Sequence, residues 1–153
     1  MTEIAEPKTE IYDPKTFNPK TGIGGLVARV RVKLFEALDE ELAPFDITAA
    51  QYVILVNLAT GVDSASGLCK GVSYDPGAMT RMIDRLERKG LVRRVRSPED
   101  RRVVNLALTE EGKAVYPKLV ASAAAATNRR LRGFTKAEAQ QLERLLQRML
   151  AND

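Results

Sequence analysis

The chain has 153 residues, of which 44% are hydrophobic, and ordinary levels of glycine and proline; this fits one compact protomer and excludes a largely disordered chain. It has no histidine and a single cysteine, Cys69, which excludes His-based metal sites, Ser-His or Cys-His catalysis and an internal disulfide framework. We therefore expect no metal site and no cofactor.

The formal charge is +4, but it is unevenly distributed. Residues 70–102 carry ten basic and five acidic residues, a net charge of +5, whereas the other 14 basic and 15 acidic residues give −1. A positive block on a near-neutral body indicates either a surface that binds a polyanion or a solvated basic face with no partner, and charge alone leaves both open.

The predicted elements begin with an irregular arm over residues 1–20, which carry three prolines among charges. From Thr21 to near Leu42, apolar residues recur every three or four positions and predict an amphipathic helix, which Pro44 ends. There is no signal peptide and no apolar run near 18 residues, so we expect a soluble, cytoplasmic protein.

Two further helices follow. Thr48 and Gln51 have the spacing of a capping box, and the helix that they open runs to about Ala59 with apolar residues on nearly every side, which predicts a buried position. A short, weak helix is expected around Ser64–Gly71, before a turn that contains Ser73.

The next helix has defined ends. Asp75 is a good N-cap, Pro76 suits the first helical position, and Gly90 suits the position just after the helix, which we expect to end at Lys89. Its apolar side chains share one face, and its N-terminal part exposes a different set, namely Gly77, Thr80 and Arg81. Arg85 flanks that set, and we expect Arg88 to form a surface ion pair with Asp84.

Leu91–Arg96 and Arg102–Leu108 predict two strands joined by a polar turn, that is, a hairpin with a charged tip. Thr109 then caps a long helix, which Pro117 is expected to kink or adjust locally. A second capping box at Thr135 opens a final helix with an apolar stripe.

The order of elements is that of a winged helix-turn-helix protein. The predicted fold is mainly α with a small β-hairpin wing. Residues 46–109 would form the winged domain, and the helices in 21–45 and 110–153 would form a dimerisation region. Arginine in a basic helix start can donate two hydrogen bonds to guanine, and an arginine at a wing tip can enter a narrow minor groove.

Three stretches resemble the multiple antibiotic resistance regulator (MarR) family of transcription factors: DITAAQYVIL (residues 46–55), GAMTRMIDRLERKGLV (77–92) and DRRVVNLALTEEG (100–112). The third matches the family's wing signature D-x-R-x-x-x-x-x-L-T. The resemblance covers about residues 21–150 and implies a homodimer in which the terminal helices interleave across a two-fold axis. It also implies a pseudo-palindromic operator on double-stranded DNA.

The resemblance places Thr80, Arg81 and Arg85 in or beside the major groove and Arg102 in the minor groove, with Asp100 as the partner that orients Arg102. The complete set of expected DNA-contacting residues is Ser73, Gly77, Thr80, Arg81, Arg85, Asp100, Arg101 and Arg102. Many family members release DNA when a small phenol or aromatic carboxylate binds. By that resemblance, Arg31 is a candidate to anchor such an effector and Tyr52 to line its pocket, although plain surface or core packing explains either residue equally well.

These observations rank three functions. The first is a sequence-specific, dimeric transcriptional regulator, more readily a repressor than an activator. The second is a winged-helix module that binds protein or nucleic acid without sequence choice. An enzyme is the weakest alternative, because the chain has no histidine, no glycine-rich phosphate loop and no convincing nucleophile-base pair.

Overall fold

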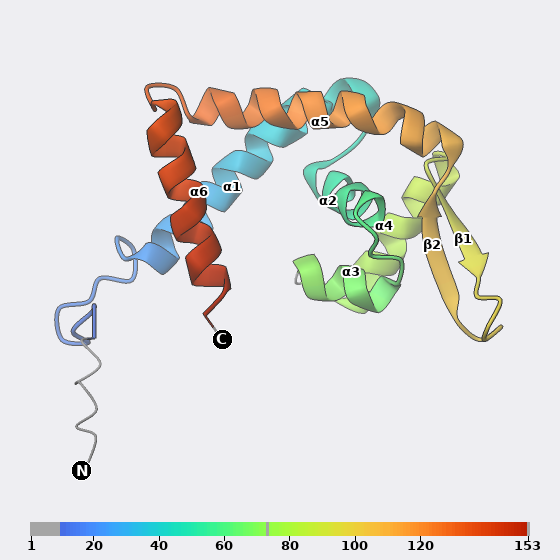
Figure 1. The fold of residues 1–153 in the computed structure, drawn as a ribbon, viewed down its shortest axis with the longest axis horizontal. Coiled ribbons are helices and arrows are strands. Elements are labelled where there is room, and N and C mark those ends of the chain that lie inside the picture. The colour runs from blue at the N-terminus through green and yellow to red at the C-terminus, as the bar shows by residue number, and fades with distance from the viewer. Residues whose placement is uncertain (1–9, 73, 153) are drawn as a thin grey trace, which may run out of the picture. The chain divides into compact units, whose positions relative to one another are not determined.

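A computed structural model describes residues 10–72 and 74–152 of the chain. The elements follow the predicted order (Figure 1). Their bounds are α1 Ile23–Leu42, a 3-10 turn Ala43–Phe45, α2 Ala49–Ala59, α3 Ala65–Val72, α4 Pro76–Arg88, β1 Val92–Arg96, β2 Val104–Leu108, α5 Glu110–Arg130 and α6 Lys136–Leu150. The predicted fold class, mainly helical with a two-stranded wing, is confirmed.

The predicted helix starts are also confirmed. The Thr48 Oγ1 accepts a hydrogen bond from the Gln51 amide at 3.2 Å, and the Gln51 side chain accepts one from the Thr48 amide at 3.1 Å. Thr135 opens α6 in the same reciprocal way. These bonds satisfy amide groups that a helix start leaves without intrahelical partners. At Pro117, α5 continues as one helix.

The chain divides into two compact units whose boundary lies between Lys33 and Leu34, within α1. In the first unit, the Tyr12 hydroxyl accepts a hydrogen bond from the Ile23 amide at 3.1 Å, at the start of α1. The Tyr12 ring packs edge-on against Phe17, with 4.9 Å between the ring centroids. The described part of the predicted arm is therefore irregular, but its aromatic side chains contact each other and the first helix.

The core of the second unit is formed by apolar side chains from several helices and from both strands of the hairpin. Helix α2 contacts α3, α4, α5 and β2, as expected for a helix with apolar residues on most sides. The fully or nearly fully buried apolar side chains of this core are Leu42, Ile47, Ile54, Leu55, Leu68, Met79, Ile83, Leu86, Leu91, Val92, Leu106, Leu108 and Leu119.

Strands β1 and β2 pair antiparallel, with Arg94 opposite Leu106 and Arg96 opposite Val104. Both strands start later than predicted. The difference is largest in β2, because Arg102 and Val103 belong to the turn, where the Val103 amide donates to the Asp100 carbonyl. A bond that the sequence did not indicate joins the hairpin to the body: the Leu106 amide donates to the Asp63 carbonyl at 2.7 Å.

Among the described residues, no single helix has the length and hydropathy to span a membrane; the segments Ile23–Phe45 and Ala49–Ala59 meet the test only jointly, with a bend of 81° between them.

The first turn of α5 packs directly on the chain that leads into the wing. Gly112 is buried there, and a Cβ at this position would overlap the carbonyl oxygen of Leu91. We therefore expect Gly112→Ala to lower the free energy of unfolding by about 1–3 kcal/mol, as overpacking does. Urea denaturation at one fixed protein concentration measures this. Lys118→Ala, at an exposed position of the same helix, should stay within about 0.5 kcal/mol; an equally small effect of Gly112→Ala would contradict the predicted overlap.

Candidate nucleic-acid interface

Both ends of α4 are held by polar contacts. Asp75 precedes the helix in an extended conformation, and its Oδ1 accepts a hydrogen bond from the Ala78 amide at 3.0 Å, while Pro76 occupies the first turn. At the other end, the Lys89 ammonium donates to the Asp46 carbonyl and lies 3.1 Å from the Asp46 carboxylate. Gly90 then has a φ of 73°, the left-handed conformation that follows many helices. The predicted start of this helix is confirmed; its last helical residue is Arg88, one residue before the predicted end, and Lys89 is the C-cap.

Packing decides which face of α4 is exposed. Met79, Ile83 and Leu86 are buried at 0–2% exposure, and Met82 packs partly against the same core. The opposite side therefore faces solvent. The exposed members of the predicted DNA-contacting set on this helix are Gly77, Thr80, Arg81 and Arg85.

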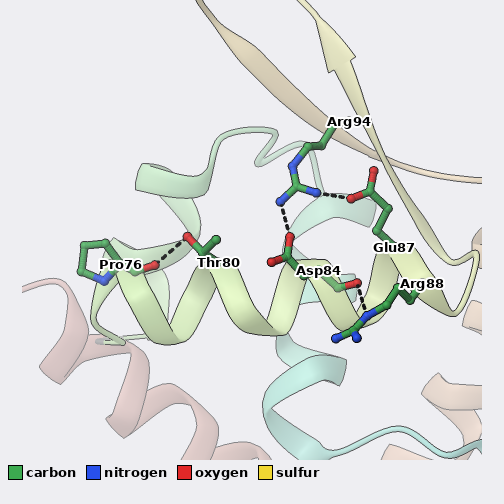
Figure 2. A network of polar contacts seen from close by, with 6 residues as sticks. All are labelled: Pro76, Thr80, Asp84, Glu87, Arg88 and Arg94. Carbon is green, nitrogen blue, oxygen red and sulfur yellow. Dashed lines mark hydrogen bonds and ion pairs between the residues drawn. The ribbon is translucent and has the colours of Figure 1, made fainter.

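The exposed start of α4 has a local geometry of its own. The Thr80 hydroxyl donates to the Pro76 carbonyl at 2.9 Å, which orients this side chain along its helix (Figure 2). A Cβ at Gly77 would lie 3.5 Å from the Arg81 Nη1, so the guanidinium of Arg81 extends toward the first turn. A cationic donor and a bare stretch of backbone thus lie side by side at the positive end of the helix dipole.

The wing tip is organised by backbone bonds. The Ser97 amide donates to the Val103 carbonyl at 2.9 Å, and the Asp100 Oδ1 accepts from the Arg102 amide at 2.9 Å. Arg101 and Arg102 are both exposed. We expected the Asp100 carboxylate to hold the guanidinium of Arg102; in the described chain its recorded partner is instead the Arg102 backbone. A short carboxylate favours the amide two residues ahead, because this bond closes a local turn.

The prediction for Asp84 is wrong. Asp84 does not form an ion pair with Arg88; the Arg88 Nε donates instead to the Asp84 carbonyl, at 3.4 Å. The Asp84 carboxylate binds Arg94 of β1 at 2.6 Å, and the Glu87 carboxylate binds the other nitrogen of the same guanidinium (Figure 2). An arginine that meets two carboxylates gains more than a single pair at i, i+4 provides. Sequence spacing along one helix cannot reveal a partner on the next strand, so Arg94 was missed.

The other candidates from the sequence are Ser73, Arg31, Tyr52 and Cys69. Ser73 lies outside the described residues. Arg31 and Tyr52 belong to different units of the chain. Arg31 is exposed on α1, whereas Tyr52 packs against the core, where burial and then the charge of Tyr116 raise the pKa of its phenol. Cys69 is partly buried against the same core.

A hollow of about 410 Å³ lies within the second unit, where the end of α1 leads into α2. Tyr52 is not among its lining residues, which are Phe35, Asp39, Ala43, Asp46, Ile47, Thr48, Ala49 and Ala50. Among the residues that the structure describes, no group of three acidic or cysteine side chains has an arrangement that would hold a metal ion.

The sequence of the chain matches those of known proteins. Residues 47–104, from the start of α2 through the wing tip, match the MarR family. The chain is 41% identical over 100 residues to the multiple antibiotic resistance protein MarR of Escherichia coli K12, an alignment that covers 65% of this chain and 69% of that protein. It is 31% identical over 114 residues to the transcriptional repressor MdtR of Bacillus subtilis, covering 74% and 71% respectively.

Solved structures of other proteins resemble this chain in fold as well as in sequence. A mutant of Escherichia coli MarR with one cysteine replaced by serine, in complex with operator DNA, superposes with a TM-score of 0.75 at 35% identity, over 88% of this chain and 98% of that one. Bordetella bronchiseptica BpsR, whose DNA binding is regulated by 6-hydroxynicotinic acid, superposes with a TM-score of 0.76 at 26% identity, over 90% and 99%. The helix start, the wing and these likenesses converge: the chain belongs to the MarR family of winged-helix transcriptional regulators, which are DNA-binding repressors and not enzymes.

Proposed function

We propose that this regulator is a homodimer that represses transcription from a pseudo-palindromic operator and leaves it when a small aromatic acid or phenol binds. The observation that carries the proposal is the exposed start of α4, with Gly77, Thr80 and Arg81 on its solvent side, next to a wing with two exposed arginines. The operator complex of the Escherichia coli relative supports DNA as the partner of this face.

In this proposal, the start of α4 enters the major groove. Gly77 allows close approach of the backbone, and Arg81 donates two hydrogen bonds to guanine O6 and N7. Thr80 contacts a base or phosphate, and Arg85 flanks the groove. Amide groups at the helix start, together with the dipole, attract a phosphate.

The wing completes the contact in the minor groove. Arg102 enters a narrow stretch of this groove, where the negative potential is strongest. Asp100 supports it through the backbone amide of Arg102, and Arg101 neutralises a neighbouring phosphate. The phosphate contact of Arg101 strengthens binding on any sequence, whereas the base contact of Arg81 selects one.

Base readout predicts a selective loss. Arg81→Ala should weaken binding by about 1–3 kcal/mol to a duplex that the wild-type protein selects from random-sequence DNA, and much less to unselected DNA. Fluorescence anisotropy with both duplexes measures the difference. Arg88→Ala removes the same charge from the end of α4 and serves as the control, with similar small losses on both.

Equal losses for Arg81→Ala on the two duplexes would favour the alternative function, a winged-helix module that binds nucleic acid or protein without sequence choice. The +5 charge of residues 70–102 would then act only on phosphates or on an acidic partner.

Apolar stripes support the homodimer. On α1, Ile23, Leu26, Val27 and Val30 are 41–54% exposed, and on α6, Leu142, Leu145, Leu146 and Met149 are 37–48% exposed. Helices with such stripes need a partner surface, because large apolar patches on one small protomer are uncommon. We assign α1, α5 and α6 to a two-fold dimerisation region, which would set two winged domains on half-sites about one helical turn apart.

A charge in the α6 stripe tests the dimer. Leu145→Glu should raise the dimer dissociation constant by at least about 30-fold, because it buries an unpaired carboxylate where an apolar anchor lay. Sedimentation velocity over a concentration series measures the constant. Gln147→Glu introduces the same charge on the other side of α6 and should leave the dimer intact. A wild-type protein that stays monomeric at micromolar concentration contradicts the proposal.

The proposed effector is a small aromatic acid or phenol. The regulation of the Bordetella relative by 6-hydroxynicotinic acid supports a small aromatic acid as the class. Arg31 is a candidate to bind its carboxylate, and Tyr52, in the other unit, is a separate candidate to contact its ring. Because the regulator acts on DNA, its place of action would be the cytoplasm of a bacterial cell.

Calorimetry across a panel of aromatic acids and phenols, with and without operator duplex, tests this step. We expect at least one compound to bind and to weaken the operator complex roughly fivefold or more, as coupling between two sites requires. Arg31→Ala should reduce the affinity for a carboxylate but not for a neutral phenol. If no compound changes operator affinity, the effector part of the proposal is wrong and the DNA part stands.

A further inference from the structure

Arg94 of the wing forms ion pairs with two residues of α4. Arg94 lies in the middle of β1, and its Nη2 is 2.6 Å from the Asp84 Oδ1, while its Nη1 donates to the Glu87 carboxylate. The two acids are three residues apart on α4, so their carboxylates project from the same face. Figure 2 shows the guanidinium between the two carboxylates.

Arg94 lies between the base and the tip of the hairpin. Its cross-strand neighbour is Leu106, whose amide is bonded to the Asp63 carbonyl. From this level to the tip, the hydrogen bonds recorded among the described residues stay within the hairpin, as at Ser97 and Val103. Arg94 is thus the outermost polar link from the described part of the wing to α4.

The pair of acids also favours arginine by chemistry. The hydrogen bond to Asp84 raises the pKa of Arg94 and, although burial opposes it, the charge of Glu87 raises the pKa further. The planar fork offers a separate nitrogen to each carboxylate, which the single ammonium of a lysine does not. All three side chains are between one third and one half exposed, so the contact contributes little to the free energy of folding. Its effect would be on the orientation of the wing relative to α4.

A small rotation of the wing has a large effect at its tip. A strand advances about 3.3 Å per residue, so the tip at Asp100–Arg102 extends roughly 10–20 Å beyond Arg94. A rotation of ten or twenty degrees at this level therefore moves the tip by several ångström, on the order of half a minor-groove width.

We propose that Arg94 is a positioning residue for DNA binding: its clamp on Asp84 and Glu87 sets the angle between wing and recognition helix, so that Arg102 and Arg81 reach their grooves together. This inference rests on the proposed placement of α4 and the wing on DNA. It requires no contact between Arg94 and DNA, and it assigns to two acids on the basic face a favourable role in binding a polyanion.

Neutralising the two acids distinguishes the clamp from simple electrostatic attraction. Asp84→Asn with Glu87→Gln makes the protein more positive by two charges, and electrostatics alone then predicts tighter binding to DNA. The clamp predicts the opposite, a loss of at least about fivefold on the selected duplex. Glu99→Gln is the control, because it removes a negative charge at the tip without touching the clamp, and it should leave binding unchanged or tighter.

A double-mutant cycle with Arg102→Ala locates the effect. In the wild-type background, Arg102→Ala removes the contribution of the minor-groove contact. In the Asp84→Asn, Glu87→Gln background the same substitution should cost at least about fivefold less, because the tip is already misplaced. Arg94→Met should behave like the double variant, and Arg94→Lys should restore only part of the coupling, since lysine does not span both acids.

Anisotropy on the selected duplex and on unselected DNA gives all of these values, and circular dichroism checks that each variant is folded. Tighter or unchanged operator binding by the Asp84→Asn, Glu87→Gln variant overturns the inference, and so does an additive cycle with Arg102→Ala. If a variant is unfolded, Arg94→Lys in the same cycle decides. A wild-type protein that selects no DNA sequence contradicts the proposed function instead, so the two failures are distinguishable.

Discussion

The burial of one face of α4 is the constraint on which the proposed DNA-binding surface depends. Met79, Ile83 and Leu86 are inserted into the core of the second unit, and their packing fixes which face of the helix is exposed. Asp75 and Pro76 determine where the helix begins, and Lys89 ties its end to Asp46. A reading surface for DNA needs such rigidity, because base-edge hydrogen bonds tolerate only small displacements.

The wing needs support from the rest of the protein, because an isolated two-stranded hairpin is only marginally stable. Its base is held by buried Val92 and Leu108 and by the bond from Leu106 to Asp63. Its tip is organised internally, with Asp100 and Ser97 bonded to backbone amides, and this leaves both tip arginines exposed. Between base and tip, Arg94 connects the hairpin to α4 through its contacts with Asp84 and Glu87. Acidic residues of this net positive segment would repel a polyanion. They also have a structural role, because they accept hydrogen bonds from backbone amides or bind the guanidinium of Arg94.

Local sequence determined most of the architecture. Helix starts at Thr48, Asp75, Thr109 and Thr135 were predictable because caps depend on side chains within three residues, and the exposed start of α4 followed from the spacing of its apolar residues. The order of elements, with the wing signature, was enough to indicate the family. The strand starts were less accurate, because a turn and a strand compete for the same residues near a tip.

The tertiary structure alone decided the partners of side chains that are distant in sequence. It paired Asp84 with Arg94 instead of Arg88, joined Leu106 to Asp63, and gave Lys89 a partner at Asp46. A helical wheel shows which residues share a face, but not which neighbouring element covers that face. Which arginine meets which acid depends on strand register and on the angle at which strand and helix pack, and both are set only when the core closes.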